Sequence, residues 1–378
     1  MKNEIHRLGD YIREVNVKNK DLKVTNLLGL SMSKQFRPST SNIVGVDLSN
    51  YKVVRNNVFA FDPMSVIRVH KVPIALNDTD FPIIVSPAYI TFECIDVEKL
   101  DPKYLMMWFQ RTEFDRYADF KSDAAVRGGY DWKELCETLI IIPSIEQQRE
   151  IVSEYETISK RIKLNQQIIK NLEATAQTLY HKMFVEGIDK ENLPEGWRIG
   201  TLGEYVELSQ GIQVEIEEQS YVKYKGYNRF IRIIDYTPNS NEPPRFVDIN
   251  NARYYSTKED VVMIRYGDAG TVCRRLEGII ANNLFKITPI KSLTRNYIYA
   301  FLRSDAIQKQ IRGSAASSTM PAITHTAIKE LKCIVPINDI IMKHNDMVDV
   351  IEKLIILHLE ELKILTEFKS LLLAKMGR

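Results

Sequence analysis

The sequence predicts an α+β protein with two similar globular domains, separated by a pair of long antiparallel coiled-coil helices and related as a pseudo-twofold internal repeat. Three observations predict this. The chain has 378 residues, 44% hydrophobic and 26% charged, which is enough for two or three packed domains. Short segments recur in the second half, and each half ends in a long heptad pattern. We therefore expect a duplicated unit made of one domain and one helix.

The repeat has an offset of about 193 residues. Matching segments occur in the same order in both halves. They are 8–12 with 202–206, 100–105 with 293–298, 133–135 with 329–331, 141–143 with 334–336, and 182–183 with 375–376. A period of half the chain is too long for a solenoid unit, so it indicates two copies of a globular module.

The boundaries follow from this repeat. We expect a first globular domain at 1–143, a central spacer helix at 144–186, a second globular domain at 193–336 and a C-terminal spacer helix at 337–378. β-rich runs predict strands at 51–54, 58–61, 83–85, 230–234 and 261–264. Helices are expected at 104–117 and 296–311, and the turn-rich segment 193–197 is a short connector.

Each spacer helix carries apolar residues at alternating steps of four and three, the pattern of a helix-helix seam. The seam residues are Ile158, Ile162, Asn165, Ile169, Leu172, Ile351, Ile355, His358, Leu362 and Leu365. Pro143 and Ser144 precede the first helix and Gly187 follows it, as expected for its start and end. About 40 residues at 1.5 Å each make a rod of about 60 Å. A structural hairpin inside one globule is the alternative.

Two polar residues occupy equivalent positions near the middle of the two helices. Asn165 and His358 are separated by the repeat offset. Buried polar residues in a seam can fix the register of two helices at some cost in stability. We therefore expect both residues in the same or adjacent layers. In the alternative, His358 reaches out to water.

Basic, amide and aromatic side chains interleave in several loops, where they could contact phosphates and base edges. In the first domain the candidates are Lys34, Gln35, Arg37, Arg68, His70, Lys71, Arg127 and Tyr130. In the second they are Lys223, Lys225, Tyr227, Arg229, Arg265, Tyr266, Arg274 and Arg275. Solvated surface loops of no special function are the alternative for each cluster. Any DNA-binding surface must come from local segregation of charge, because the net charge is only +2.

Several chemistries are not indicated. The four cysteines form no C-x-x-C pair and the six histidines show no metal-ligand spacing, so we expect no metal site and a reducing, cytoplasmic location. No phosphate-binding G-x-x-x-x-G-K-[ST] loop occurs, and residues 241–244 match the tetrapeptide of amino-methyltransferases only faintly. Neither a signal peptide nor a membrane span is indicated. We expect a binding protein without catalytic residues or a cofactor of its own.

Residues 140–151 read Ile-Ile-Ile-Pro-Ser-Ile-Glu-Gln-Gln-Arg-Glu-Ile. This segment is similar to the Pro-x-x-Glu-Gln-x-x-Ile sequence that begins the central helix of a known family, the specificity (S) subunits of type I restriction-modification systems. Further similar segments are 85–89, 193–197, 265–270 and 282–284. The second helix departs from the pattern, since Pro336 is followed by Ile-Asn-Asp without Glu-Gln. A role for those two polar residues is therefore not expected there.

The resemblance covers almost the whole chain and implies a DNA sequence-specificity subunit. Each domain would read one half of a bipartite, asymmetric target in double-stranded DNA, and the helices would set the spacer. It also implies docking of two methyltransferase (M) subunits and, with them, restriction (R) subunits. S-adenosylmethionine, ATP and Mg²⁺ would belong to those partners. The alternatives are a stand-alone enzyme, against which the missing motifs argue, and a coiled-coil scaffold without a DNA role.

Overall fold

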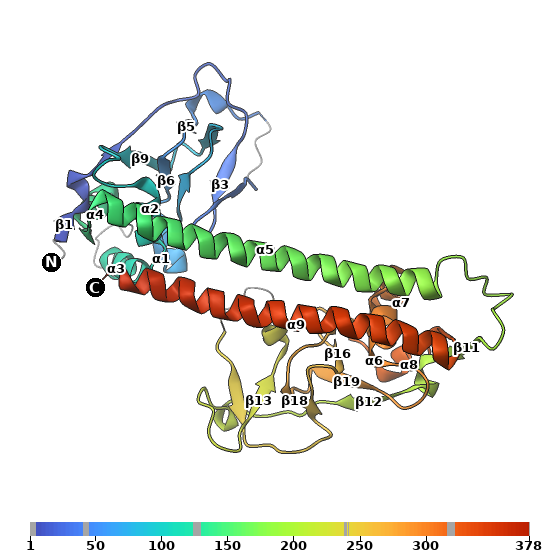
Figure 1. Cartoon of the computed structure of the whole chain (residues 1–378). Helices are drawn as coiled ribbons and strands as arrows, with labels where there is room; N and C mark the ends of the chain where they lie inside the picture. The colour runs from blue at the N-terminus through green and yellow to red at the C-terminus, as the bar shows by residue number, and fades with distance from the viewer. Residues whose placement is uncertain are drawn as a thin grey trace. The chain divides into compact units, whose positions relative to one another are not determined.

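The computed structural model describes residues 5–40, 45–123, 130–237, 240, 242–315 and 322–377. Two compact units contain them (Figure 1). The first unit comprises Met1–Leu164 and Leu362–Arg378, and the second comprises Asn165–Glu361. Each unit thus holds a mixed sheet-and-helix domain and a part of each of two long helices, α5 (Ile145–Phe184) and α9 (Asn338–Lys375). The α+β prediction with long paired helices is confirmed.

The first unit is built on a four-stranded antiparallel sheet of order β2-β9-β6-β7. Its strands are β1 (Ile5–Arg7), β2 (Ile12–Glu14), β3 (Leu28–Leu30), β4 (Phe36–Pro38), β5 (Lys52–Val54), β6 (Val58–Phe61), β7 (Ile74–Asn77), β8 (Ile83–Val85), β9 (Ile90–Cys94) and β10 (Leu139–Ile141). Its short helices are α1 (Val66–Val69), α2 (Pro102–Phe109), α3 (Thr112–Asp123) and α4 (Trp132–Glu137). Stacked and edge-on rings of Phe59, Phe92 and Phe109 fill the core between the sheet and α2.

The second unit repeats this plan, with a sheet of order β12-β19-β16-β17 and a second sheet of order β14-β13-β18-β15. Its strands are β11 (Arg198–Thr201), β12 (Val206–Gln210), β13 (Asn228–Ile231), β14 (Arg245–Val247), β15 (Tyr255–Ser256), β16 (Val261–Ile264), β17 (Val272–Cys273), β18 (Gly278–Ile280), β19 (Leu284–Pro289) and β20 (Lys332–Val335). Its short helices are α6 (Arg295–Arg303), α7 (Asp305–Ala315) and α8 (His325–Lys329).

The internal repeat extends to single hydrogen bonds and close contacts. The Tyr104 hydroxyl donates to the Ile141 carbonyl at 3.0 Å, and the equivalent Tyr297 donates to the Ile334 carbonyl at 2.5 Å. A Cβ at Gly9 or at Gly203 would come within 2.8 Å of the Cβ of Cys136 or Lys329, respectively. Glycine is needed at both places because any larger residue would clash. The duplication indicated by the sequence is therefore confirmed.

The local predictions are partly corrected. Strands are found at 52–54, 58–61, 83–85 and 261–264, as expected. The expected strand 230–234 ends at Ile231 and a 3₁₀ helix follows at Ile233–Tyr236. Each expected long helix is two helices. The extended backbone of Ser304 separates α6 from α7, and a tight turn at Gln110 and Arg111 separates α2 from α3. Apolar periodicity runs through both breaks, so it cannot reveal them.

The two long helices run antiparallel within each unit. In the second unit, Asn165 of α5 meets His358 of α9, and further along α5 the ring of Tyr180 meets His344, earlier on α9. In the first unit, Tyr155 lies against Lys369. All ten expected seam residues are buried or half-buried. The His358 Nδ1 and Asn165 Oδ1 atoms are 2.5 Å apart, so the expectation that these residues share a layer is confirmed.

Arg274 and Arg275, just after β17, tie the sheet of the second unit to both long helices. Arg275 forms two 2.9 Å hydrogen bonds to Glu352 of α9 and one of 2.5 Å to Glu173 of α5. Arg274 also pairs with Glu352 and lies 3.9 Å above the Tyr299 ring. Their side chains are 4% and 13% exposed, which corrects their assignment as DNA contacts. The carboxylates hold them inside because an unpaired buried charge is costly.

His344 generates a pH prediction. This buried imidazole packs edge-on to Phe184, neither ring nitrogen has a hydrogen-bond partner among the described residues, and burial lowers its pKa from 6.5 to about 4. Between those pH values only the unfolded chain binds the proton, so the free energy of unfolding falls as the pH drops from 6.5 to 4, by up to about 1.4 kcal/mol per pH unit. His344→Phe should remove the contribution of this imidazole to the fall in unfolding free energy. Urea unfolding at pH 7, 6 and 5 measures that contribution. Replacing the exposed His181 by Phe is the control and should leave the pH profile unchanged.

The arginine network generates a stability prediction. In a double-mutant cycle, Arg275→Ala and Glu352→Ala should each lower the free energy of unfolding by about 3 kcal/mol, because either change leaves a buried charge without its partner. The coupling free energy between the two substitutions should exceed about 1 kcal/mol. The matched control is the exposed Lys258–Glu360 pair, whose atoms lie 3.5 Å apart and whose coupling should stay below about 0.5 kcal/mol. Chemical denaturation measures both cycles. Equal coupling in the two pairs would contradict the role given to the network.

Candidate nucleic-acid interface

The loop before β13 presents the most open basic and aromatic surface of the second unit. Lys223 and Lys225 are exposed, and the rings of Tyr224 and Tyr227 lie edge to face with centroids 5.3 Å apart. Nearby in the same unit, the Arg245 guanidinium stacks 3.8 Å above the Tyr221 ring. Cations beside rigid aromatic rings suit contact with phosphates and bases. The DNA-binding assignment of Lys223, Lys225 and Tyr227 stays a prediction, and the structure leaves these side chains accessible.

Arg229, at the start of β13, has a different environment. Its guanidinium forms a 3.0 Å ion pair with Asp235, which is nearly buried and also binds Arg232 at 3.1 Å. This carboxylate fixes the 3₁₀ turn after β13, because it accepts the backbone N–H of Arg232 as well. Arg229 therefore helps to stabilise the turn, and its assignment as a DNA contact stays a prediction, since its side chain is 34% exposed.

A cluster of amides surrounds Arg265 at the ends of β12 and β16. The Arg265 Nη1 atom donates to Gln210 Oε1 at 3.2 Å, and Gln210 also donates to the Asn282 carbonyl. Asn282 is exposed and donates from its side chain to Gln213. A Cβ at Gly211 would lie 2.2 Å from the Ala281 carbonyl oxygen, so glycine is required for the two segments to approach. Guanidinium and amide groups are the side chains that read base edges in pairs of hydrogen bonds.

The sequence identified only part of this cluster. Arg265 and its stacked neighbour Tyr266, 4.9 Å from the guanidinium to the ring centroid, were expected. Gln210 and Gln213 were missed because a single amide in or after a strand has no sequence signature. Sheet register brings Gln210 to Arg265, and Gln213 joins the cluster through Asn282. The Nε atom of Arg265 is buried without a hydrogen-bond partner among the described residues, so this guanidinium keeps a free donor.

The candidates of the first unit divide into exposed and buried residues. Gln35, Arg37, Arg68, His70 and Lys71 are exposed, and their DNA role stays a prediction. The Nδ1 atom of His70 lies 2.8 Å from Asp119. Arg127 lies outside the described residues.

Lys34 and Tyr130 require correction because their side chains are inside the first unit. Lys34 is 5% exposed and its ammonium binds Asp115 at 2.7 Å. Tyr130 is fully buried and its hydroxyl lies 2.6 Å from that of Thr138. Burial raises the pKa of this phenol above its ordinary value, so it stays neutral. Both residues stabilise the domain and neither is placed to contact DNA.

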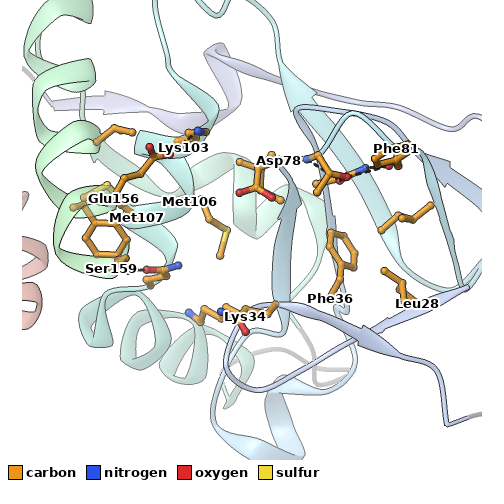
Figure 2. A pocket seen from close by; sticks show the side chains of 18 of the residues that line it. Leu28, Lys34, Phe36, Asp78, Phe81, Lys103, Met106, Met107, Glu156 and Ser159 are labelled. Carbon is orange, nitrogen blue, oxygen red and sulfur yellow. Dashed lines mark hydrogen bonds and ion pairs between the residues drawn. The ribbon is translucent and has the colours of Figure 1, made fainter. Parts of the chain in front are cut away.

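A pocket of about 730 Å³ opens in the first unit (Figure 2). One wall comes from β3, β4 and the end of β7, with Leu28, Phe36 and Asp78. The other comes from α2 and α5, with Met106, Glu156 and Ser159, and Lys369 of α9 also lines it. Such a concave site with mixed apolar and polar walls is typical of a binding surface.

Among the described residues, no group of three or more His, Cys, Asp or Glu side chains is arranged to hold a metal ion. No helix in the described part of the chain is long and apolar enough to cross a membrane.

Comparisons with known proteins agree with these features. Residues 194–369 match the family model described as "Type I restriction modification DNA specificity domain". No curated protein matches the chain. Among solved structures, the S subunit of a type I restriction-modification system from M. genitalium is 16% identical and shares the fold, with a TM-score of 0.58 over 99% of this chain and 95% of that one.

Two further structures are similar over nearly their whole length. The HsdS subunit from Thermoanaerobacter tengcongensis is 18% identical, with a TM-score of 0.39 over 99% of this chain and 96% of that one. A chain from a structure of the assembly and conformational transition of the type I R-M system is 19% identical, with a TM-score of 0.47 over 99% and 97%. The family match confirms the DNA-specificity role that the sequence indicated. Residues 194–369 belong to the family of type I restriction-modification DNA specificity domains.

Proposed function

We propose that this chain is the non-catalytic specificity subunit of a type I restriction-modification enzyme that acts on DNA in the cytoplasm. Each unit reads one half of a bipartite, asymmetric DNA sequence, and the length of the helices sets the spacer between the halves. The observation that carries this proposal is the duplicated sheet domain, of order β2-β9-β6-β7 in one unit and β12-β19-β16-β17 in the other, each packed on the same two helices.

The two units carry different side chains at equivalent strand ends, which supports an asymmetric target. By sheet order β6 is the equivalent of β16, and Arg265 follows β16 directly. The segment after β6 reads Asp-Pro-Met-Ser and contains no arginine. An acid cannot make the hydrogen bonds of a guanidinium. Two surfaces that differ in this way select different base sequences.

The exposed face of α9 supports docking of the two methyltransferase subunits on the helices. Within the second unit it shows Val350, Leu354 and Leu357, which are 42–61% exposed. Within the first unit it shows Ile364, Phe368 and Leu371, which are 53–60% exposed. These residues follow the four-and-three spacing of a second heptad stripe, the face that another helix can cover.

The reactive chemistry belongs to the partners in this proposal. The methyltransferase subunits supply S-adenosylmethionine and methylate adenine, and restriction subunits supply ATP hydrolysis with Mg²⁺. This chain contributes binding and spacing. The missing catalytic and phosphate-binding motifs of the sequence argue against a stand-alone enzyme.

The first experiment compares adenine methylation across native genomic DNA of the source strain with that of a strain lacking this gene. We expect loss of one bipartite asymmetric motif. Complementation with Lys223→Glu/Lys225→Glu should restore methylation at well below the wild-type level, because two phosphate-binding cations become anions. Lys190→Glu/Lys291→Glu, at exposed positions outside this loop and outside both long helices, is the charge-matched control and should restore full methylation. Unchanged methylation in all strains would contradict the proposed function.

A second experiment tests the spacing role. Insertion of one heptad into α5 and the matching heptad into α9 keeps the seam in register and lengthens the rod by about 10 Å. Since base pairs are about 3.4 Å apart, the recognised spacer should grow by about three base pairs with both half-sites unchanged. Long-read methylation mapping gives the new motif. A spacer of the original length would contradict the proposal that the length of the helices sets the spacer.

A further inference from the structure

The two units differ most where the domain meets the long helices. In the second unit Arg274 and Arg275 fill this crevice and leave a cavity of only about 10 Å³. In the first unit the corresponding crevice is the pocket of about 730 Å³ (Figure 2). The repeat offset relates the linings directly. Met106, Gln110, Tyr155, Ser159 and Lys369 occupy the positions of Tyr299, Arg303, Val348, Glu352 and Ala176.

The first unit lacks the side chains that fill the crevice in the second. By sheet order β7 is the equivalent of β17, and residues 76–79 at the end of β7, which line the pocket, include no arginine. The Asn77 amide is used within the domain, because it donates to the carbonyls of Val54 and Phe81, both at 3.0 Å. Asp78 is exposed and short. Among the described residues of the first unit, no side chain equivalent to Arg274 or Arg275 reaches the long helices.

Two lysines of the pocket are paired with carboxylates, and a third cation lies on its helical wall. Lys34 pairs with Asp115 at 2.7 Å and Lys103 with Glu156 at 2.5 Å. Lys369 has no carboxylate partner among the described residues and lies 4.6 Å from the Tyr155 ring centroid, and burial lowers its pKa. The Oγ atom of Ser159 is also buried without a hydrogen-bond partner in the described part of the chain.

The opposite wall presents apolar side chains beside polar ones. Leu28 and Phe36 face the pocket, Met106 lies between the walls, and Phe81 stands at the rim (Figure 2). Phe81 is 77% exposed and offers an apolar surface that a partner can cover. The pocket thus offers a cation and a hydroxyl on one side and apolar side chains on the other.

We propose that this pocket receives a segment of the docked methyltransferase subunit that carries a carboxylate beside a bulky apolar side chain. The carboxylate pairs with Lys369, and the apolar side chain packs against Phe36, Met106 and Phe81. In the second unit cations of the domain meet acids of the helices, and in the first unit the helix supplies the cation and the partner supplies the acid.

DNA is a poorer occupant than a protein segment. A phosphate could pair with Lys369, but a phosphodiester has no apolar part to cover Phe81. The carboxylates of Asp78 and Glu156 also line the pocket and repel a polyanion. The proposal rests on the proposed function, because it takes the methyltransferase as the partner that binds the helices.

The test measures the affinity of the purified methyltransferase for the full-length chain by calorimetry, together with the melting temperature of the chain alone. Lys369→Met should weaken binding by about tenfold or more, because it removes one side of a partly buried ion pair. The melting temperature should stay the same or rise, because an uncompensated half-buried charge is removed. Lys369→Arg should retain most of the affinity. Lys363→Met, at an exposed position on the same helix, is the control and should bind like the wild type.

A second variant keeps the test independent of folding. Phe81→Asp alters an exposed rim residue and should also weaken binding by about tenfold. Wild-type affinity in both Lys369→Met and Phe81→Asp would overturn this inference while leaving the proposed function intact. A wild-type chain that does not bind the methyltransferase would overturn the proposed function and the inference with it. Loss of affinity for duplex DNA in Lys369→Met, with methyltransferase binding unchanged, would assign the pocket to DNA and overturn the inference.

Discussion

Both units depend on the pairing of α5 with α9. In proteins most of the stability of a helix comes from packing of its apolar face, and the seam gives each helix an apolar surface to cover. Within the second unit the Asn165–His358 contact places a polar pair in that seam. A slip in register would separate the amide from the imidazole and bury each without its partner, which costs more than an apolar layer would gain. One polar layer therefore fixes the alignment on which the domain contacts depend.

The two units differ in the charged side chains at the junction between the domain and the long helices. The second domain is fixed to the helices by arginines that insert between Glu173 and Glu352, and the positive φ of Arg275 (75°) shows that the backbone accepts an unfavourable conformation to place it. The first domain has no such arginines at the equivalent strand end, and an open pocket with Lys369 on its wall remains there. A duplicated fold has thus acquired one closed and one open domain-helix junction, through changes at a few positions in matching loops.

The sequence predicted much of the fold for physical reasons. Heptad spacing, the repeated Leu-Gly-acid segment and buried runs such as 58–61 and 261–264 depend on local periodicity, so they are visible without a structure. Periodicity failed at Gln110 and Ser304, where one apolar stripe continues across two helices. Candidate site residues fared less well. A basic side chain in a loop has the same sequence signature whether it faces solvent, as Lys223 does, or a buried carboxylate, as Lys34 and Arg274 do.

The sequence by itself determined the class of the protein, its internal duplication, the positions of the two long helices and the polar pair in their seam. Each of these depends on neighbours within a few residues or on repetition along the chain. Only the tertiary structure decided which cations are free, because that depends on carboxylates about 80 to 100 residues away, as with Arg275 and Glu352 or Lys34 and Asp115. It also decided that Gln210 and Asn282 join Arg265 and that one crevice is filled while the other is open. Sheet register brings such residues together, and register is a property of the folded chain.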